Sequence, residues 1–290
     1  MLNILITGAT GNVGTEVLKS LMKLTLSSNI IAGVRDLETD SDKLKIYNTT
    51  TVKFDLKDRS TFAAALHTID VVFLVRPPKI SSVKKYFKPF IDSAVEAEIK
   101  HIVFLSVQGA EKSNLIPHHN IEKLIVDSKI AYTFLRPAYF MQNFTTTLRN
   151  DLINKQRIFL PAGKAKFTLV DVSDIGKVAA VILSDPAKYI NKCFELTCNQ
   201  KLTFYEMAEA LTAGLGQKIK YESPDIFTFY RTKRLEKVPS KLILIMIMLH
   251  FLPRFQKEPC TSDCIGKITG QQPITFEHFI CNNKKLLTNS

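Results

Sequence analysis

The chain has 290 residues, of which 46% are hydrophobic and 23% are charged, a composition typical of a soluble globular protein with a sizeable core. Its formal net charge of +12 favours anionic partners, but Lys and Arg are spread along the chain. We therefore interpret the excess as solubility charge plus a phosphate-bearing cofactor, and we expect no direct nucleic-acid binding because no helix-turn-helix, zinc pattern or basic helix is visible.

Short apolar runs alternate with helical stretches through the first half of the chain. Strands are expected at residues 2–7, 29–35, 51–56, 70–78, 101–106 and 131–137, and helices at 13–24, 59–67, 87–97 and 119–128. Continuous Val, Ile and Leu runs separated by helices indicate a parallel sheet covered on both faces. Right-handed crossovers then give the doubly wound α/β fold of the Rossmann type.

The pattern loosens after residue 137. A strand and a helix with Asp174 as its cap are expected over 167–183, a strand over 193–197 and a capped helix over 202–216. We expect a Rossmann domain at 1–150 and a smaller, mainly helical substrate or cap domain at 151–290, with 166–200 returning to the Rossmann core.

Neither a metal site nor a membrane partner is expected. The five cysteines show no two-residue spacing of a zinc or redox site, which favours free thiols in a reducing cytosol and a cytoplasmic location. The most apolar run, residues 242–252, is far shorter than the ~20 residues that span a bilayer. We interpret it as a buried or groove-covering helix.

Three glycines follow the first strand in TGATGNVGTEVL. Gly8 permits the tight turn into a helix, Gly11 lets the backbone approach a pyrophosphate, and Gly14 lets the helix pack close to the sheet. The helix N-terminus presents N–H groups and a partial positive charge to phosphates. The sequence therefore predicts a nicotinamide dinucleotide held by Gly8, Thr10, Gly11, Asn12, Val13 and Gly14.

The end of the second strand decides which dinucleotide is expected. Dinucleotide folds often place an acid there to bind the ribose 2′-OH. Arg35 falls at or one residue from that place, and a guanidinium binds a 2′-phosphate bidentately. The alternative is that Asp36 rotates in and selects NADH. We favour NADPH over NADH.

The carboxyl ends of the third and fourth strands are expected to border the cofactor, because ligands bind there in this fold. Asp55 either accepts from the adenine amino group or caps the next turn, and Arg76 is either a second phosphate contact or a surface charge. The residues expected at these two ends are Asp55, Leu56, Val75, Arg76, Pro77 and Pro78.

Four segments resemble the NmrA-like family of atypical short-chain dehydrogenases/reductases. They are ILITGATGNVG, VRD, IEKLIVDSKIAYTFLRPAYFMQNF and ITGQQPITFEHF, in this order over nearly the whole chain. The resemblance implies an NAD(P)-binding Rossmann domain with a small C-terminal substrate domain. Members of the family divide into reductases, such as quinone oxidoreductases and azoreductase-like enzymes, and non-catalytic sensors that report redox state to a protein partner.

Ordinary members of the superfamily use a Tyr and a Lys four residues later as an acid/base pair. No Tyr occurs from Phe87 to Ala131, so this pair is absent. With Glu122 matched to the family's glutamate, His118 takes the place of the Lys, and the two share one helix face. A shifted register pairs His119 with Lys123 instead, and a third interpretation gives neither histidine a role beyond the helix start.

The nicotinamide end is expected near the ends of the fifth and sixth strands. The residues expected beside the cofactor are Ser106, Pro137 and Tyr139. The alternative for Ser106 is that it only ends its strand and contacts no ligand. An apolar substrate pocket is expected to include Phe140, Asn143 and Phe227, with core packing as the alternative for the aromatic rings.

Two functions fit these patterns. The first is an NADPH-dependent oxidoreductase that passes hydride to a quinone-like or conjugated acceptor, since reduction of a quinone needs little acid help. The second is a non-catalytic NAD(P)-dependent redox sensor that acts through a protein partner. The expected ligands are a dinucleotide and a small apolar or aromatic acceptor, on a monomer or homodimer.

Overall fold

The computed structural model describes residues 1–24, 28–77, 80, 82–114 and 116–288, so Pro78 at the end of the expected fourth strand lies outside the described residues. The chain forms two compact units. Unit 1 comprises Met1–Pro137, Val172–Leu196 and Cys264–Gln271, and unit 2 comprises Ala138–Asp171, Thr197–Asp263 and Gln272–Ser290. The boundary thus differs from the expected one at residue 150, because the chain after Pro137 packs into a separate hydrophobic core.

Unit 1 is built on a seven-stranded sheet in the order β10-β6-β5-β4-β1-β2-β3. Its strands are β1 (Leu2–Thr7), β2 (Ser28–Val34), β3 (Thr50–Lys53), β4 (Val71–Val75), β5 (His101–Leu105), β6 (Ala131–Pro137) and β10 (Lys192–Leu196). Every neighbouring pair is parallel, so the predicted doubly wound sheet is confirmed. The strand order reverses between β1 and β4, where this fold opens a crevice at the carboxyl ends of its strands.

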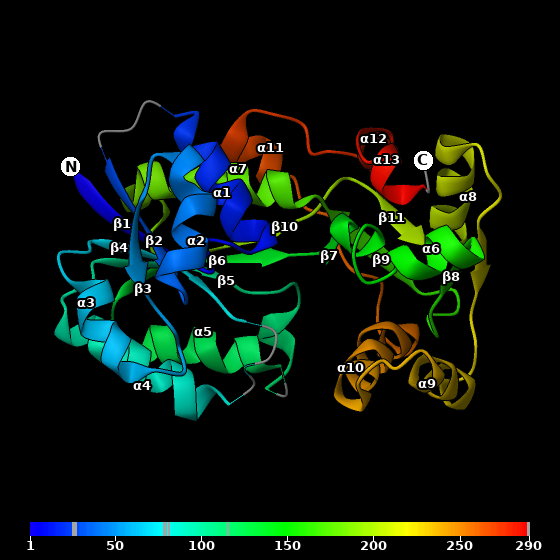
Figure 1. The fold of residues 1–290 in the computed structure, drawn as a ribbon, viewed down its shortest axis with the longest axis horizontal. Helices are drawn as coiled ribbons and strands as arrows, with labels where there is room; N and C mark the ends of the chain where they lie inside the picture. The colour runs from blue at the N-terminus through cyan, green and yellow to red at the C-terminus, as the bar shows by residue number, and fades with distance from the viewer. Residues whose placement is uncertain (25–27, 78–79, 81, 115, 289–290) are drawn as a thin grey trace. The chain divides into compact units, whose positions relative to one another are not determined.

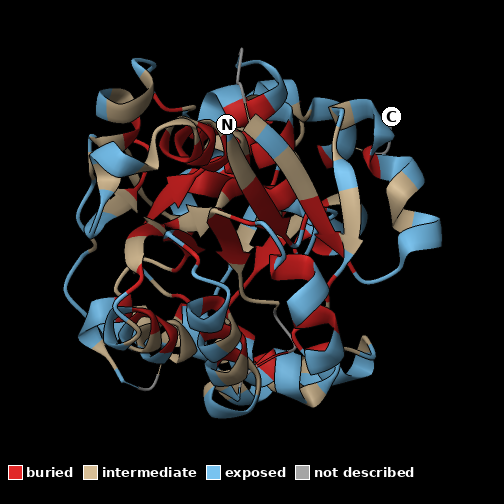
Figure 2. Cartoon of the chain, turned by 90° about the vertical axis from the view of Figure 1, so that its left-hand side faces the viewer, coloured by how far each residue is buried: buried red, intermediate tan, exposed pale blue. Residues whose placement is uncertain are grey.

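Helices cover both faces of this sheet (Figure 1). They are α1 (Asn12–Met22), α2 (Leu37–Leu44), α3 (Phe62–Leu66), α4 (Val83–Glu96), α5 (Pro117–Asp127), α7 (Val172–Ser184) and α11 (Cys264–Thr269). Helices α1 and α7 pack together on one face, and α3, α4 and α5 lie on the other. Figure 2 shows the central strands as buried, as their continuous apolar runs predict.

Unit 2 combines two small sheets with helices. The first sheet has the order β11-β9-β7 and the second pairs β12 with β8. The strands are β7 (Tyr139–Phe140), β8 (Arg157–Phe159), β9 (Lys166–Val170), β11 (Lys201–Thr203) and β12 (Lys220–Glu222). The helices are α6 (Arg149–Lys155), α8 (Phe204–Leu215), α9 (Ile226–Leu235), α10 (Ser240–Phe251), α12 (Phe276–Asn282) and α13 (Lys284–Leu287).

Helix α8 begins and ends where its sequence predicts. The Thr203 hydroxyl accepts from the Glu206 N–H, and the Glu206 carboxylate accepts from the Thr203 N–H, which is a complete capping box. Gly216 ends the helix with φ +73°, a left-handed conformation that glycine adopts without strain.

Helix α10 is only partly buried, so of the two expectations for it, a buried or a groove-covering helix, the first is not met. Ile243, Met246 and His250 are buried, but most of its other apolar side chains are exposed. A helix that is apolar on every side carries no periodicity to show which face is covered. Across the described residues, no helix combines the length and the apolar character that a membrane span requires.

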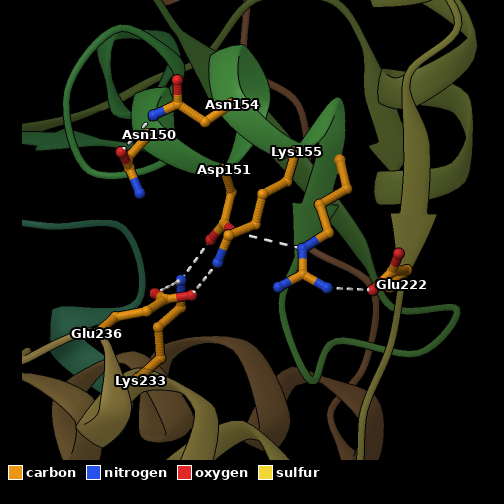
Figure 3. A network of polar contacts seen from close by, with 8 residues as sticks. Asn150, Asp151, Asn154, Lys155, Glu222, Lys233 and Glu236 are labelled. Carbon is orange, nitrogen blue, oxygen red and sulfur yellow. Dashed lines mark hydrogen bonds and ion pairs between the residues drawn. The ribbon is translucent and has the colours of Figure 1, made fainter.

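An ion-pair network joins α6, β8, β12 and α9 within unit 2 (Figure 3). Asp151 pairs with the buried Lys233, with Arg157 at 3.3 Å and with Lys155 at 3.6 Å. Glu236 pairs with Lys155 and with Lys233, and Glu222 pairs with Arg157 at 2.6 Å. Three carboxylates thus balance three cations, as the burial of Asp151 and Lys233 requires.

Candidate functional site

The glycine turn after β1 folds back tightly on itself. Gly8 has φ +63°, and its carbonyl oxygen accepts a hydrogen bond from the Gly11 N–H at 2.9 Å. A Cβ atom on Gly14 would lie 2.2 Å from that same oxygen, so only glycine fits. Gly11 is the N-cap of α1 and provides no side chain to its N–H groups. The first turn of α1 therefore offers its N–H groups to an anion.

Thr7 anchors this turn beside β4, although the sequence analysis did not single it out. Its hydroxyl donates to the Phe73 carbonyl at 2.9 Å and accepts from the Val75 N–H at 2.9 Å. These bonds fix the carboxyl ends of β1 and β4 against each other, and Val75 lies next to Gly8. The signal in the sequence was a Thr that ends an apolar strand directly before the first glycine.

Arg35 and Asp36 follow β2 at the same edge of the sheet as the glycine turn. Thr7 of β1 is in register with Gly33 of β2, so the two strands end side by side. Asp36 caps α2, because its carboxylate accepts from the N–H groups of Glu38 at 3.0 Å and Thr39 at 3.3 Å. Hydrogen bonds from Thr39 lower the pKa of Asp36. Within the described part of the chain, the exposed Arg35 side chain makes no hydrogen bond or ion pair.

The end of β3 leads into a tight turn. The Asp55 carboxylate accepts from the Lys57 N–H at 2.9 Å, which is the turn-capping role that the sequence left open. Leu56 is buried in the core of unit 1. A contact of either residue with an adenine ring stays a prediction.

Arg76 is engaged by neighbouring groups of unit 1, and its contact with a phosphate stays a prediction. Its Nε donates to His118 Nε2 at 3.1 Å, and its Nη1 donates to the carbonyls of Ile80 at 2.6 Å and Pro77 at 3.4 Å. The guanidinium thus ties the segment after β4 to the start of α5. Because an arginine N–H can only donate, His118 Nε2 is an acceptor and the ring proton of the neutral imidazole sits on Nδ1.

His118 is therefore neutral at physiological pH. Burial, and then the positive charge of Arg76, lowers the pKa of His118 from 6.5 to about 3. If His118 assists a reaction, it does so as a neutral Nδ1–H donor, not as an imidazolium.

Replacing Arg76 with Gln is expected to raise the pKa of His118 above about 3, because a nearby positive charge is removed. The pKa is expected to stay below 6.5, since burial is the larger cause and remains. The measurement is a pH titration of the histidine ring protons by NMR, with His118→Asn to assign the signal. Arg59→Gln, at an exposed site of unit 1, serves as control. An unchanged pKa in Arg76→Gln contradicts this description of the pair.

Glu122 lies in a buried ionic cluster. Arg136 donates to its two carboxylate oxygens at 3.0 and 2.7 Å, and the Ser106 hydroxyl donates to Oε1 at 2.5 Å. These contacts join α5 to the ends of β5 and β6. Burial opposes the charge of Arg136, but the hydrogen bonds and charge of Glu122 outweigh it and raise the Arg136 pKa. Glu122 is thus engaged with both Ser106 and Arg136.

The alternative pair, His119 and Lys123, lies four residues apart on α5, and its role stays a prediction. His119 Nδ1–H donates to the Ala110 carbonyl at 3.0 Å, and Lys123 is exposed on α5. His118 and Glu122 both belong to α5, but their hydrogen bonds go to different partners, Arg76 for the first and Arg136 for the second.

Tyr139, expected beside the cofactor, belongs to unit 2, as do the residues expected in a substrate pocket. Tyr139 of β7 packs edge-on against Phe167, Phe204 and His250. His250 Nδ1–H donates to the Met246 carbonyl at 2.6 Å, so its Nε2 accepts from the Tyr139 hydroxyl at 3.3 Å. Burial raises the pKa of Tyr139 despite a hydrogen bond from Asn143.

The remaining predicted residues divide between core and surface. Pro137 is buried at the end of β6, and Phe140 and Asn143 are half-buried. Phe227 on α9 is 86% exposed, whereas its neighbour Phe229 is fully buried in the core of unit 2. A substrate pocket formed by Phe140, Asn143 and Phe227 stays a prediction.

Comparison with known proteins places the chain in a family. The model of the NmrA-like family matches residues 2–256. Prestalk A differentiation protein A of Dictyostelium discoideum is 30% identical over 283 residues, 96% of this chain and 91% of that protein. NAD(P)H azoreductase of Xenophilus azovorans is 28% identical over 280 residues, 95% of this chain and 96% of that protein.

A solved structure shares the fold over nearly the whole chain. The triphenylmethane reductase of Citrobacter sp., complexed with NADP(H), superposes with a TM-score of 0.87 at 24% identity, and the match covers 97% of this chain and 99% of that one. The family match spans both the glycine turn and most of unit 2. This chain belongs to the NmrA-like family.

Proposed function

We propose that unit 1 binds NADPH and that the protein is an oxidoreductase that passes hydride to a quinone-like or other conjugated acceptor. The observation that carries the proposal is the glycine turn, whose helix N–H groups lie at the same sheet edge as Arg35, which none of the described residues engages. The relatives support it, because an azoreductase and a triphenylmethane reductase are by name reductases of conjugated compounds.

The residues of unit 1 fit this dinucleotide. Gly8, Gly11 and Gly14 leave no side chain between the turn and a pyrophosphate, and the N–H groups of α1 would hold its oxygens. Arg35 would hold the 2′-phosphate, since Asp36 is committed to capping α2. When bound, NADPH supplies a hydride for the acceptor.

We propose that His118 orients the nicotinamide end. It begins α5, near the carboxyl ends of β4 and β5, and Arg76 fixes both its ring orientation and its tautomer. Its Nδ1–H, which bonds to none of the described residues, would donate a hydrogen bond to a carboxamide or to a ribose oxygen. A quinone accepts hydride without a strong acid because its reduced oxyanion is stable, so the absent Tyr–Lys pair is compatible with turnover.

The proposed function is tested by following NADPH oxidation by the purified protein with a panel of quinones and azo dyes. We expect acceptor-dependent oxidation, faster with NADPH than with NADH. Tight dinucleotide binding without oxidation of NADPH by any acceptor would contradict the proposal and favour a redox sensor.

Replacing Arg35 with Gln is expected to weaken NADPH binding about 10- to 100-fold, because a hydrogen-bonded charge pair contributes about 1.5–3 kcal/mol. NADH binding is expected to stay unchanged, since NADH carries no 2′-phosphate. Calorimetric titration of both dinucleotides measures this difference. Lys84→Gln removes the same charge from an exposed site on α4 and is the matched control. If Arg35→Gln weakens the binding of NADH and of NADPH equally, the assignment of Arg35 to the 2′-phosphate is contradicted.

A further inference from the structure

The outward face of α10 is an exposed apolar stripe. Its members are six side chains with 42–58% exposure: Leu242, Leu244, Ile245, Met248 and Leu249 of α10, and Leu252, which follows it. They recur at the three- and four-residue spacing of one helix face, opposite the buried Ile243, Met246 and His250. Exposed apolar faces of this kind mark interaction sites.

The segment that carries this stripe is strongly basic. Exposed Lys and Arg side chains over residues 226–257 are Arg231, Arg234, Lys237, Lys241, Arg254 and Lys257. Glu236 is the only acidic residue of this segment, and it is engaged in the ion-pair network with Lys155 and Lys233. Within residues 226–257 the apolar stripe is therefore accompanied by six exposed positive charges, and the exposed acids Asp225 and Glu258 lie just outside this segment.

An open, polar groove adjoins the end of the stripe within unit 2. It has a volume of about 560 Å³, and its lining includes Lys164, Lys166 and Arg254. Glu258 pairs with Lys166 at 3.2 Å, which leaves Lys164 and Arg254 as the uncompensated cations of the groove. Arg254 belongs to the 3-10 helix Leu252–Phe255 that directly follows α10.

We propose that unit 2 docks on an anionic membrane surface, with the stripe of α10 in the interfacial layer and lipid phosphates at Lys241, Arg254 and Lys164. Apolar side chains flanked by cations are what such a surface binds. A second copy of the chain is disfavoured as the occupant, because a symmetric contact would bring the same positive charges together. A surface helix needs no bilayer-spanning length, so the proposal departs from the expected absence of a membrane partner.

The proposal goes beyond the proposed function and is tested without any dinucleotide. The full chain is sedimented with vesicles of phosphatidylcholine containing roughly one third phosphatidylserine, and with vesicles of phosphatidylcholine alone. We expect binding to the anionic vesicles, weaker binding to the neutral ones, and loss of binding as salt is raised.

Two double variants separate the apolar from the ionic part of the surface. Ile245→Gln/Leu249→Gln is expected to lower partitioning at least about tenfold, because apolar area is lost from the interface. Lys241→Gln/Arg254→Gln is expected to lower it about 25-fold, since each cation near an anionic surface contributes about fivefold.

Matched controls use exposed residues elsewhere. Ile46→Gln/Val95→Gln removes apolar side chains from unit 1, and Lys218→Gln/Lys220→Gln removes two charges from another part of unit 2. Both are expected to bind like the unaltered chain. No binding of the unaltered chain to anionic vesicles, or equal binding of all variants, overturns the proposal. A dimer in analytical ultracentrifugation that Ile245→Gln/Leu249→Gln dissociates also overturns it, because the stripe is then a subunit interface.

Discussion

Replacing Gly14 with Ala is expected to weaken NADPH binding at least about tenfold and to lower the free energy of unfolding by about 1–3 kcal/mol. The added Cβ would lie 2.2 Å from the Gly8 carbonyl oxygen and 2.9 Å from the Ala9 Cα, which are backbone atoms that cannot rotate away. The turn must open, and the N–H groups of α1 then move from the place where a pyrophosphate would lie.

Calorimetric titration with NADPH and thermal or urea unfolding measure the two effects of Gly14→Ala. Gly266→Ala is the matched control in unit 1, because a Cβ there meets its nearest atom at 3.7 Å, an ordinary contact. This control is expected to bind NADPH normally and to be no less stable, since alanine favours a helix over glycine. Normal NADPH binding by Gly14→Ala would contradict the role given to the glycine turn.

Replacing Asp151 with Asn is expected to lower the free energy of unfolding by about 3–5 kcal/mol. Asp151 is the carboxylate on which Lys233, Arg157 and Lys155 converge, so its loss leaves the buried Lys233 insufficiently balanced (Figure 3). Asp151→Leu/Lys233→Met removes both buried charges and is expected to recover at least about half of the loss, because apolar replacements of a buried pair are often neutral.

Urea unfolding measures these differences, with Lys188→Met as the control. Lys188 pairs with Asp185 on the surface, where both side chains are well exposed, so its loss is expected to cost less than about 1 kcal/mol. If Asp151→Asn lowers the free energy of unfolding no more than Lys188→Met does, the stabilising role proposed for the network is contradicted.

The contribution of Asp151 to the free energy of unfolding is also expected to depend on pH. Burial opposes the charged form, but Lys233 and the neighbouring cations outweigh it and lower the pKa of Asp151. A carboxyl group whose pKa is lower in the folded than in the unfolded protein stabilises the fold at pH values above its unfolded pKa of about 3.9. This contribution is lost as the pH falls through the folded-state pKa. The stability difference between the unaltered chain and Asp151→Asn is therefore expected to shrink below about pH 4.

The parts of the fold that the sequence predicted are those that depend on local pattern. The strands of unit 1, the glycine turn and the capping box of α8 each rest on residues close together in the chain. The strand β10, which comes after the first excursion into unit 2, was also predicted. A buried parallel strand is recognised by its consecutive apolar residues, and a tight turn is recognised by the positions of its glycines.

The contacts of the site depend on residues far apart, which no local pattern specifies. Arg76 and His118 are 42 residues apart, and Tyr139 and His250 are 111 apart. The sequence identified candidate site residues but could not predict which residues their side chains would hydrogen-bond to. These candidates are Arg76, His118, Glu122 and Tyr139. The sequence also left open whether Arg35 or Asp36 faces the ribose, and it did not predict that Asp36 caps α2.

The central claim is that this chain uses NADPH to reduce a conjugated acceptor, and a single-turnover reaction tests it most directly. The protein is loaded with one equivalent of NADPH without oxygen and mixed with a quinone, and absorbance follows the nicotinamide while the hydroquinone is quantified. We predict that one quinone is reduced for each NADPH oxidised, and more slowly in His118→Asn. NADPH that stays bound and unoxidised in the presence of the quinone would contradict the claim.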